Sequence, residues 1–226
     1  MYKACLFDLD GTLLDTVESI AHVANQVLAH YGLGPVPVEL FNYFAGDGAD
    51  ELIRRCFVRT GGNLSYLDEA RQMYRDLFAE DPLYHVSAYI GMPETLLKLK
   101  DRGVRLAVCT NKPHTAAVGA IHGIYGDGLF DVIQGQMPSI PRKPAPDSAL
   151  LIAHRLGVKP EECMYVGDTD TDMKTGNRAC MLTIGVLWGF RERKELEENH
   201  AHYIIERPEE LLDIQRKRGK YHAELQ

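Results

Sequence analysis

The stretch from Lys3 to Thr12, KACLFDLDGT, constrains the fold more than any other part of the chain. Four apolar residues, Ala4–Phe7, run without a polar break into Asp8, and Asp10 and Gly11 follow. A short continuous apolar run is typical of a strand that is buried on both faces, as in a parallel sheet. Gly11 ends the strand, so both carboxylates stand at its carboxyl end, where open α/β sheets place their chemistry.

The two carboxylates, Asp8 and Asp10, suggest a metal site. Carboxylates this close repel each other, and a divalent cation relieves the repulsion. Hard oxygen ligands of this kind suit Mg²⁺. The same letters also fit a plain strand-to-turn junction in which Asp and Gly serve the turn, so the choice between the two rests on the rest of the chain.

The composition narrows the classes of function. The chain has 226 residues, of which 45% are hydrophobic, enough for one large domain or one domain with an insert. Its formal net charge of −7 argues against nucleic acid or an anionic membrane as the main partner. The sequence has no run of 18 apolar residues, so no membrane span is expected. The expected core strand begins almost at once, which leaves no room for a signal peptide. We expect a cytoplasmic protein, with monomer and homodimer both open.

The cysteines and histidines argue against a disulfide framework and a zinc site. The five cysteines form no C-x-x-C pair, and Cys5, Cys109 and Cys163 fall in expected buried strands. This usage fits reduced thiols that fill a core. The nine histidines show no H-x-x-x-H pattern and no cluster with cysteine, so no zinc site is expected.

Helical periodicity fills the first third of the chain after the opening strand. Apolar residues recur at spacings of three and four within residues 17–31, 49–57 and 66–78, and a shorter helix is expected within residues 35–44. No strand pattern separates these segments. We therefore expect residues 16–82 to form an inserted four-helix cap domain, and residues 1–15 plus 83–226 to form the core domain.

From residue 93 onward, expected strands alternate with expected helices. The strands span residues 104–109, 131–134, 163–166, 182–186 and 203–205, and the helices span residues 93–102, 115–124, 146–156, 170–179, 191–198 and 208–218. Such alternation indicates a parallel sheet with right-handed crossovers. The predicted fold class is therefore α/β, with a Rossmann-like parallel sheet core that carries the inserted four-helix cap.

Polar side chains gather at or just past the carboxyl ends of the expected strands. A parallel sheet aims all these ends at one edge, so residues far apart in sequence can meet there. Among them, a carboxylate can act as a nucleophile on phosphorus, and a second acid can serve the leaving oxygen. A hydroxyl, an amide and an ammonium can hold phosphoryl oxygens. The residues are Asp8, Asp10, Thr110, Asn111, Lys143, Asp168 and Asp172.

In this order and strand context, the motifs resemble those of the haloacid dehalogenase superfamily of phosphohydrolases. The stretch Asp8–Thr12, DLDGT, is similar to the first motif of that family, Thr110 to the second and Lys143 to the third. The stretch Gly167–Asp172, GDTDTD, is similar to the fourth motif. The resemblance covers nearly the whole chain, and it implies a helical cap between the first and second motifs.

The resemblance also implies a role for each residue. Asp8 would be the nucleophile and Asp10 the general acid and base. Mg²⁺ would be held by the Asp8 side chain, the backbone carbonyl of Asp10 and Asp168. Asp172 would support the metal ligand Asp168 from behind.

The phosphate would be bound by Thr110, Asn111 and Lys143, and Asp172 would also support Lys143. For Lys112, a residue that binds a second anionic group of the substrate and a solvated charge in a loop are equally good interpretations. The expected partner is a small phosphorylated metabolite.

Within the superfamily, residues 8–16, 46–53 and 110–113 look most like phosphoglycolate phosphatases. This resemblance implies Mg²⁺-dependent hydrolysis of 2-phosphoglycolate to glycolate and phosphate through an aspartyl-phosphate. The alternatives are a phosphomutase, a pyrophosphatase or nucleotidase of the same branch, and a catalytically silent binding protein. Halide removal fits less well, because that branch does not use the second carboxylate, here Asp10.

Overall fold

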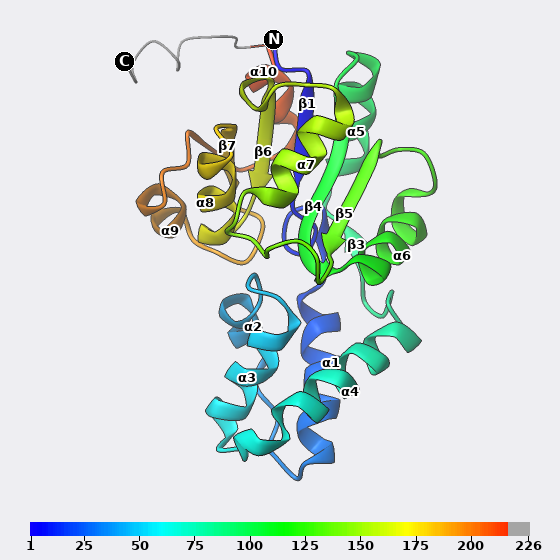
Figure 1. Ribbon diagram of the computed structural model, residues 1–226, viewed down its shortest axis with the longest axis vertical. Coiled ribbons are helices and arrows are strands. Elements are labelled where there is room, and N and C mark those ends of the chain that lie inside the picture. Colours follow the sequence, from blue (N-terminus) through cyan, green and yellow to red (C-terminus); the bar gives the residue numbers. More distant parts are fainter. Residues whose placement is uncertain (217–226) are drawn as a thin grey trace.

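A six-stranded parallel sheet forms the centre of the larger lobe in the structure, a computed structural model in which residues 1–216 are described (Figure 1). The strand order is β5-β4-β1-β6-β7-β8, so the first strand lies in the middle. The predicted fold class is confirmed in its parallel α/β core. The strands are β1 (Ala4–Phe7), β4 (Arg105–Pro113), β5 (Val132–Gln136), β6 (Cys163–Gly167), β7 (Leu182–Val186) and β8 (Tyr203–Ile205).

Strand β1 is buried on both faces, as its unbroken apolar sequence predicts. It pairs in parallel with β4 on one side and with β6 on the other. Cys5 and Phe7 join the hydrophobic cluster on one face of the sheet, and Ala4 and Leu6 join the cluster on the opposite face. This alternation follows from the two-residue period of a strand.

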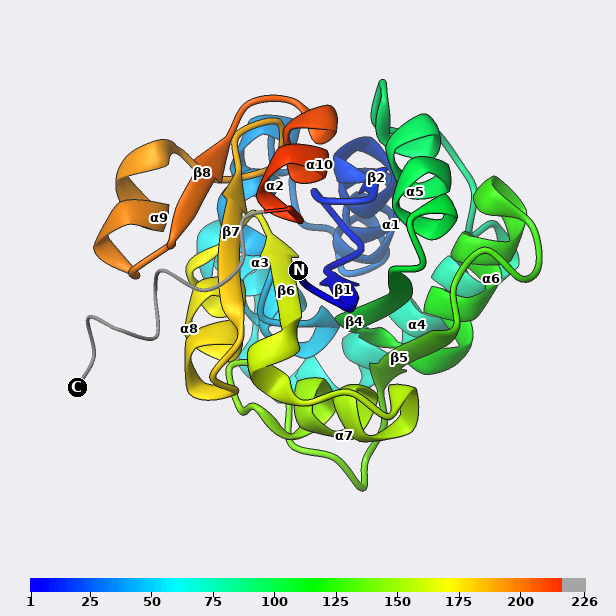
Figure 2. The same cartoon turned by 90° about the horizontal axis from the view of Figure 1, so that it is seen from above.

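Helices cover both faces of the sheet (Figure 2). One cluster includes side chains of α5 (Met92–Asp101), α6 (His114–Tyr125) and α10 (Leu211–Ile214). The cluster on the other face includes side chains of α7 (Asp147–Leu156). Helix α8 (Asp170–Arg178) packs against β6 and β7, and α9 (Arg193–Glu198) contacts α8 and β8.

A second lobe is built from helices alone and lies beyond the carboxyl end of β1 (Figure 1). It has its own hydrophobic cluster, with Phe41, Ile53 and Phe57 fully buried. Four α-helices therefore occur where helical periodicity predicts them, while the bounds of a cap domain stay a prediction. The elements are α1 (Val17–His30), α2 (Val38–Phe44), α3 (Ala49–Thr60), α4 (Leu67–Glu80) and the 3₁₀ turn Leu64–Tyr66.

The structure differs from the expected elements at three places. Two short strands, β2 (Leu14–Asp15) and β3 (Ser87–Ala88), pair in antiparallel fashion where the chain passes from the core to the helical lobe and back. A two-residue strand leaves no periodic pattern to detect. Strand β4 continues past Cys109 to Pro113, with an irregular register against β5 over that part. The expected helix 208–218 is replaced by a 3₁₀ turn (Pro208–Glu210) and α10, and its residues 217 and 218 lie outside the described residues.

The environment of the cysteines agrees with the sequence analysis. Cys5, Cys109 and Cys163 lie in β1, β4 and β6, and all three are buried and free. Across residues 1–216, none of the helices has the length and apolar character that crossing a bilayer requires.

Candidate active site

Three buried carboxylates meet at the carboxyl edge of the sheet. Asp8 directly follows β1, Asp168 directly follows β6, and Asp172 lies in the first turn of α8. One oxygen of each can be chosen so that the three atoms lie within 4.8 Å of one another. Because β1 and β6 are neighbours in the sheet, residues 160 positions apart in sequence reach one point.

The ammonium of Lys143 lies between two of these carboxylates. Its Nζ is 2.9 Å from Oδ1 of Asp8 and 2.7 Å from Oδ1 of Asp172. Only 1% of the Lys143 side chain is exposed. Burial alone would lower the pKa of Lys143, but the carboxylates of Asp172 and Asp8 raise that pKa above its ordinary value, so the ammonium stays charged.

Hydrogen bonds fix the orientation of the carboxylates of Asp168 and Asp172. Thr12 Oγ1 donates to Oδ1 of Asp168 at 2.7 Å, and the backbone N–H of Phe190 donates to its Oδ2 at 2.9 Å. Oδ2 of Asp172 accepts from the N–H of Thr169 at 3.1 Å and from its hydroxyl at 2.7 Å. The N–H of Asp172 in turn donates to Oγ1 of Thr169 at 3.4 Å, and this bond and the one from the Thr169 N–H form the N-terminal cap of α8, which anchors Asp172 to the helix start.

Two glycines allow these carboxylates to approach the backbone. Gly11 has a φ of +86°, and a β-carbon at this position would lie 2.3 Å from Oδ2 of Asp168. A β-carbon at Gly167 would lie 2.3 Å from Cβ of Asp172. The turn after β1 and the end of β6 therefore require glycine for steric reasons.

The cluster crowds three carboxyl groups around one ammonium. Burial, together with the neighbouring Asp172, raises the pKa of Asp8 to about 7 in spite of the opposing effect of Lys143. Burial and the charges of Asp172 and Asp8 also raise the pKa of Asp168 well above its ordinary value. A set of three crowded carboxylate groups with a single ammonium fits a hard divalent cation such as Mg²⁺, which takes oxygen ligands.

The cluster overlaps with the predicted metal ligands but is not identical to them. It contains Asp8 and Asp168, and it adds Asp172, which the sequence analysis places behind the ligands. The predicted contribution of Asp10 is a backbone carbonyl, and its side chain points to another partner. The ammonium of Lys112 lies 2.9 Å from Oδ1 of Asp10 and 3.3 Å from Oδ2.

A cavity of about 370 Å³ adjoins this cluster, between the sheet edge and the helical lobe. From the core it is lined by Asp8, Asp10 and Lys112, and from the lobe by side chains that include Arg75 and Phe78. This volume suits a small ligand. Lys112 is only 9% exposed, so the interpretation of this residue as a solvated loop position is wrong.

The remaining two predicted phosphate ligands lie at the end of β4. Oγ1 of Thr110 accepts a hydrogen bond from the N–H of Lys112 at 3.2 Å. The Asn111 side chain accepts from the N–H of Lys143 at 3.0 Å and donates to the carbonyls of Gly46 and Lys143 at 3.0 and 3.2 Å. Asn111 therefore connects the loop that carries Lys143 to the helical lobe, while still lining the cavity.

Thr12 is a site residue to which the sequence analysis gives no role, and Lys112 is one for which it leaves two interpretations open. Thr12 is the hydroxyl donor to Asp168, which only the packing of two distant loops reveals. For Lys112 a signal is present in the sequence. It follows Thr110 by two positions along β4, and a strand places such residues on the same face.

Comparison with known proteins identifies the family. Residues 5–186 match the family of haloacid dehalogenase-like hydrolases. The chain is 30% identical over 212 residues to the phosphoglycolate phosphatase of Aquifex aeolicus, covering 94% of this chain and 96% of that one. It is 32% identical over 223 residues to that of Haemophilus influenzae strain KW20, covering 94% and 98%.

A solved structure gives the same result. The crystal structure of a predicted phosphatase from Clostridium acetobutylicum superposes with a TM-score of 0.82 at 26% identity, covering 95% of this chain and 98% of that one. The fold, the ordered motifs and the extent of these matches lead to one conclusion. The chain belongs to the haloacid dehalogenase-like hydrolases, and within them it is similar to phosphoglycolate phosphatases.

Proposed function

We propose that this hydrolase is a Mg²⁺-dependent phosphatase of small phosphomonoesters, and that its substrate is 2-phosphoglycolate, which it converts to glycolate and phosphate. The observation that carries the proposal is the buried group of Asp8, Asp168 and Asp172 with Lys143, next to a cavity of metabolite size. The names of the relatives from Aquifex aeolicus and Haemophilus influenzae support the choice of substrate.

In the first step, an oxygen of Asp8 attacks the phosphorus atom. A bond forms between that oxygen and phosphorus, and the bond between phosphorus and the ester oxygen breaks. Asp10, two residues on and lining the same cavity, gives its proton to the departing alkoxide of glycolate. The product of this step is an aspartyl-phosphate on Asp8.

In the second step, water attacks the phosphorus of the aspartyl-phosphate while Asp10 accepts a proton from that water. The bond between phosphorus and the Asp8 oxygen breaks, which releases inorganic phosphate and restores the carboxylate. Asp10 thus regains the proton that it gave to glycolate. One residue serves both steps because the second reverses the direction of proton transfer in the first.

The metal would be held by the Asp8 carboxylate, Asp168 and the backbone carbonyl of Asp10, and Asp172 would support Asp168 and Lys143. When bound, Mg²⁺ offsets the repulsion between the phosphate and the carboxylates and aligns the phosphoryl group for in-line attack. The crowding of three buried carboxylate groups supports this assignment, because it leaves negative charge that the ammonium of Lys143 does not balance.

The phosphoryl oxygens would be bound by Thr110, Asn111 and Lys143. The hydroxyl of Thr110 and the ammonium of Lys143 supply donors, and the contacts of Asn111 with Lys143 hold the two loops in register. Residues 16–82 would act as a cap that excludes water and selects the substrate. Cavity residues from α4, among them Tyr74 and Phe78, support this division of labour.

The test is the release of inorganic phosphate from a panel of phosphorylated metabolites, with Mg²⁺ and with excess chelator. We expect a preference for 2-phosphoglycolate that disappears with chelator and in Asp8→Asn, which removes the nucleophile and should lower turnover by at least roughly 10³-fold. The matched control is Asp127→Asn, whose side chain is 87% exposed, and it should keep wild-type activity.

Other outcomes would contradict parts of the proposal. Hydrolysis retained by pure Asp8→Asn protein would refute the aspartyl-phosphate, and comparable turnover of many esters would refute the named substrate. An isomerised sugar phosphate with no release of inorganic phosphate would identify a phosphomutase instead.

A further inference from the structure

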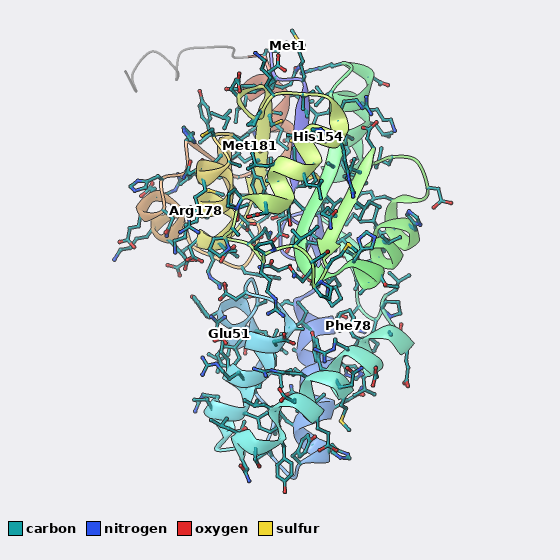
Figure 3. The ribbon with its side chains drawn as sticks, in the orientation of Figure 1. Met1, Glu51, Phe78, His154, Arg178 and Met181 are labelled. Atoms are coloured by element: carbon teal, nitrogen blue, oxygen red, sulfur yellow. The ribbon has the colours of Figure 1, made fainter. Side chains whose placement is uncertain are left out.

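Lys112 lines the cavity and carries a positive charge to which the proposed chemistry gives no task. The ammonium of Lys143 is shared by Asp8 and Asp172 at 2.9 and 2.7 Å. That of Lys112 lies at the junction of the two lobes, next to Asp10 of the core and 4.2 Å from the ring centroid of Phe78. Phe78, labelled in Figure 3, belongs to the last turn of α4.

We propose that Lys112 determines the specificity of the site by binding a second anionic group of the substrate, a carboxylate one or two carbon atoms from the phosphoester oxygen. The inference rests on the proposed phosphatase function and assigns to it a residue and a class of substrate.

The hydrogen-bonding capacity of Lys112 leaves room for such a ligand. An ammonium has three N–H donors. Within residues 1–216, its hydrogen bonds go to the carboxylate of Asp10, and a further side of the group faces the ring of Phe78. The residue is only 9% exposed and lines the cavity, so a ligand bound in the cavity can reach the ammonium. A substrate carboxylate would form a charge-assisted hydrogen bond there.

The geometry limits the length of the substrate. As the proposed acid, Asp10 must come within about 2.6–3.2 Å of the ester oxygen. Lys112 lies within 3.3 Å of both oxygens of the same carboxylate. The ester oxygen and the ammonium are therefore at most roughly 6.5 Å apart, and a hydrogen bond of about 2.8 Å from the ammonium leaves a gap of at most about 3.7 Å. A tether of one or two carbon atoms spans that gap.

Arg75 is the other basic residue that lines the cavity, and its side chain is already engaged within the helical lobe. Its Nη1 lies 2.9 Å from Oδ1 of Asp50, and its Nη2 donates to Oε1 of Gln72 at 3.0 Å. Recognition of the anion by Arg75 would require breaking these contacts, whereas Lys112 needs only its remaining donor. This difference makes Arg75→Met a matched control for Lys112→Met.

The experiment compares kcat/KM for 2-phosphoglycolate and ethyl phosphate, in which a methyl group replaces the carboxylate. We expect the wild type to prefer 2-phosphoglycolate by at least about 10-fold, because a charged hydrogen bond to a buried group is worth that much. Lys112→Met should remove most of that preference, mainly through KM for 2-phosphoglycolate. Lys112→Arg should recover part of it, and Arg75→Met should retain it.

An equal loss on both esters in Lys112→Met would overturn the inference, since Lys112 would then only position Asp10. Loss of the preference in Arg75→Met but not in Lys112→Met would also overturn it. If the variants do not fold, the inference is tested by comparing turnover of the ester substrates by the wild type. An anion-binding ammonium would be refuted if ethyl phosphate, or O-phosphoethanolamine with an ammonium in place of the carboxylate, were turned over as well as 2-phosphoglycolate. Failure of the wild type to release phosphate from any ester, a generic aryl phosphate included, would instead refute the proposed function.

Discussion

At the scale of single residues, the buried ammonium of Lys143 is the group on which the site depends most. It faces Asp8 and Asp172, and its side chain is 1% exposed. Lys143→Met keeps most of the volume but leaves two buried carboxylates without their cation. Removing one partner of a buried ion pair costs about 3–5 kcal/mol, so we expect a loss of that order in the free energy of unfolding when chelator is present.

Urea denaturation followed by circular dichroism measures this loss. The control is Lys174→Met, whose partner Asp170 is in an exposed pair on α8, with side chains 42% and 32% exposed, and there we expect less than about 1 kcal/mol. Added Mg²⁺ should recover part of the stability of Lys143→Met, because the cation also neutralises the carboxylates. Equal urea midpoints for wild type and Lys143→Met would show that the ammonium balances no buried charge.

From the raised pKa of Asp8 we predict how the stabilising effect of Mg²⁺ varies with pH. Its pKa in the folded protein is about 7, against an ordinary value of 3.8, since burial and Asp172 disfavour its charge. The folded metal-free protein therefore holds a proton that the unfolded chain has lost between these two values. The stability from this proton is fully present below about pH 4 and is lost as the pH rises through about 7.

Protons and Mg²⁺ compete for Asp8, and also for Asp168, whose pKa is raised by burial and by Asp172 and Asp8. The increase in Tm that saturating Mg²⁺ produces should therefore be larger at about pH 8 than at about pH 5. Thermal denaturation with and without chelator at both pH values tests this expectation. Asp8→Asn should show a weaker dependence on pH, and an increase in Tm that is the same at both pH values would contradict the raised pKa values.

At the scale of elements, the sequence predicts what depends on periodicity and on motifs. The unbroken apolar run of β1 and the apolar stripes of the helices are local sequence patterns, and these elements lie where they are expected. The ribbon of β2 and β3 is not predictable, because each strand has only two residues, too few to show a periodic pattern. Helix α10 is also shorter than its apolar pattern, because packing decides where such a helix ends.

The site shows the same division. The motifs place Asp8, Asp168 and Lys143 at strand ends, and the sheet order brings them together. What the motifs leave out is the set of partners, such as the hydroxyl of Thr12 on Asp168 and the pairing of Lys112 with Asp10. The partner of Asp168 is decided by side-chain directions in loops, for which a sequence carries no periodic signal, whereas the place of Lys112 on β4 does carry one.

At the scale of the whole molecule, a short segment of the helical lobe, residues 45–50, contacts four separate parts of the core. The carbonyl of Ala45 accepts from Arg191 at 3.0 Å, and that of Gly46 accepts from Asn111 at 3.0 Å. Oδ1 of Asp47 accepts from Thr171 at 2.9 Å, one residue before Asp172. The position of this segment relative to the core is therefore coupled to the loops that carry the site.

Asp50, at the end of that segment, is the carboxylate shared between the lobes. It pairs with Arg142, which precedes Lys143 in the core, and with Arg75 of α4. Asp50→Asn removes the charge that both arginines face, so the helical lobe should seat less firmly over the cavity. We expect KM for 2-phosphoglycolate to rise by about 3- to 10-fold, with a smaller change in kcat, since a partly exposed ion-pair network contributes about 1 kcal/mol.

The neighbouring Glu51 provides the control, because its partners Arg54 and Arg55 both belong to the same helix, α3. Glu51→Gln changes the same net charge at the adjacent position without touching the core, so its KM should stay near that of the wild type. High ionic strength should raise KM of the wild type toward that of Asp50→Asn, because salt screens ion pairs that are partly exposed. An equal rise of KM in Glu51→Gln would attribute the effect to net charge, and the pairing of Asp50 with Arg142 would then have no part in seating the helical lobe.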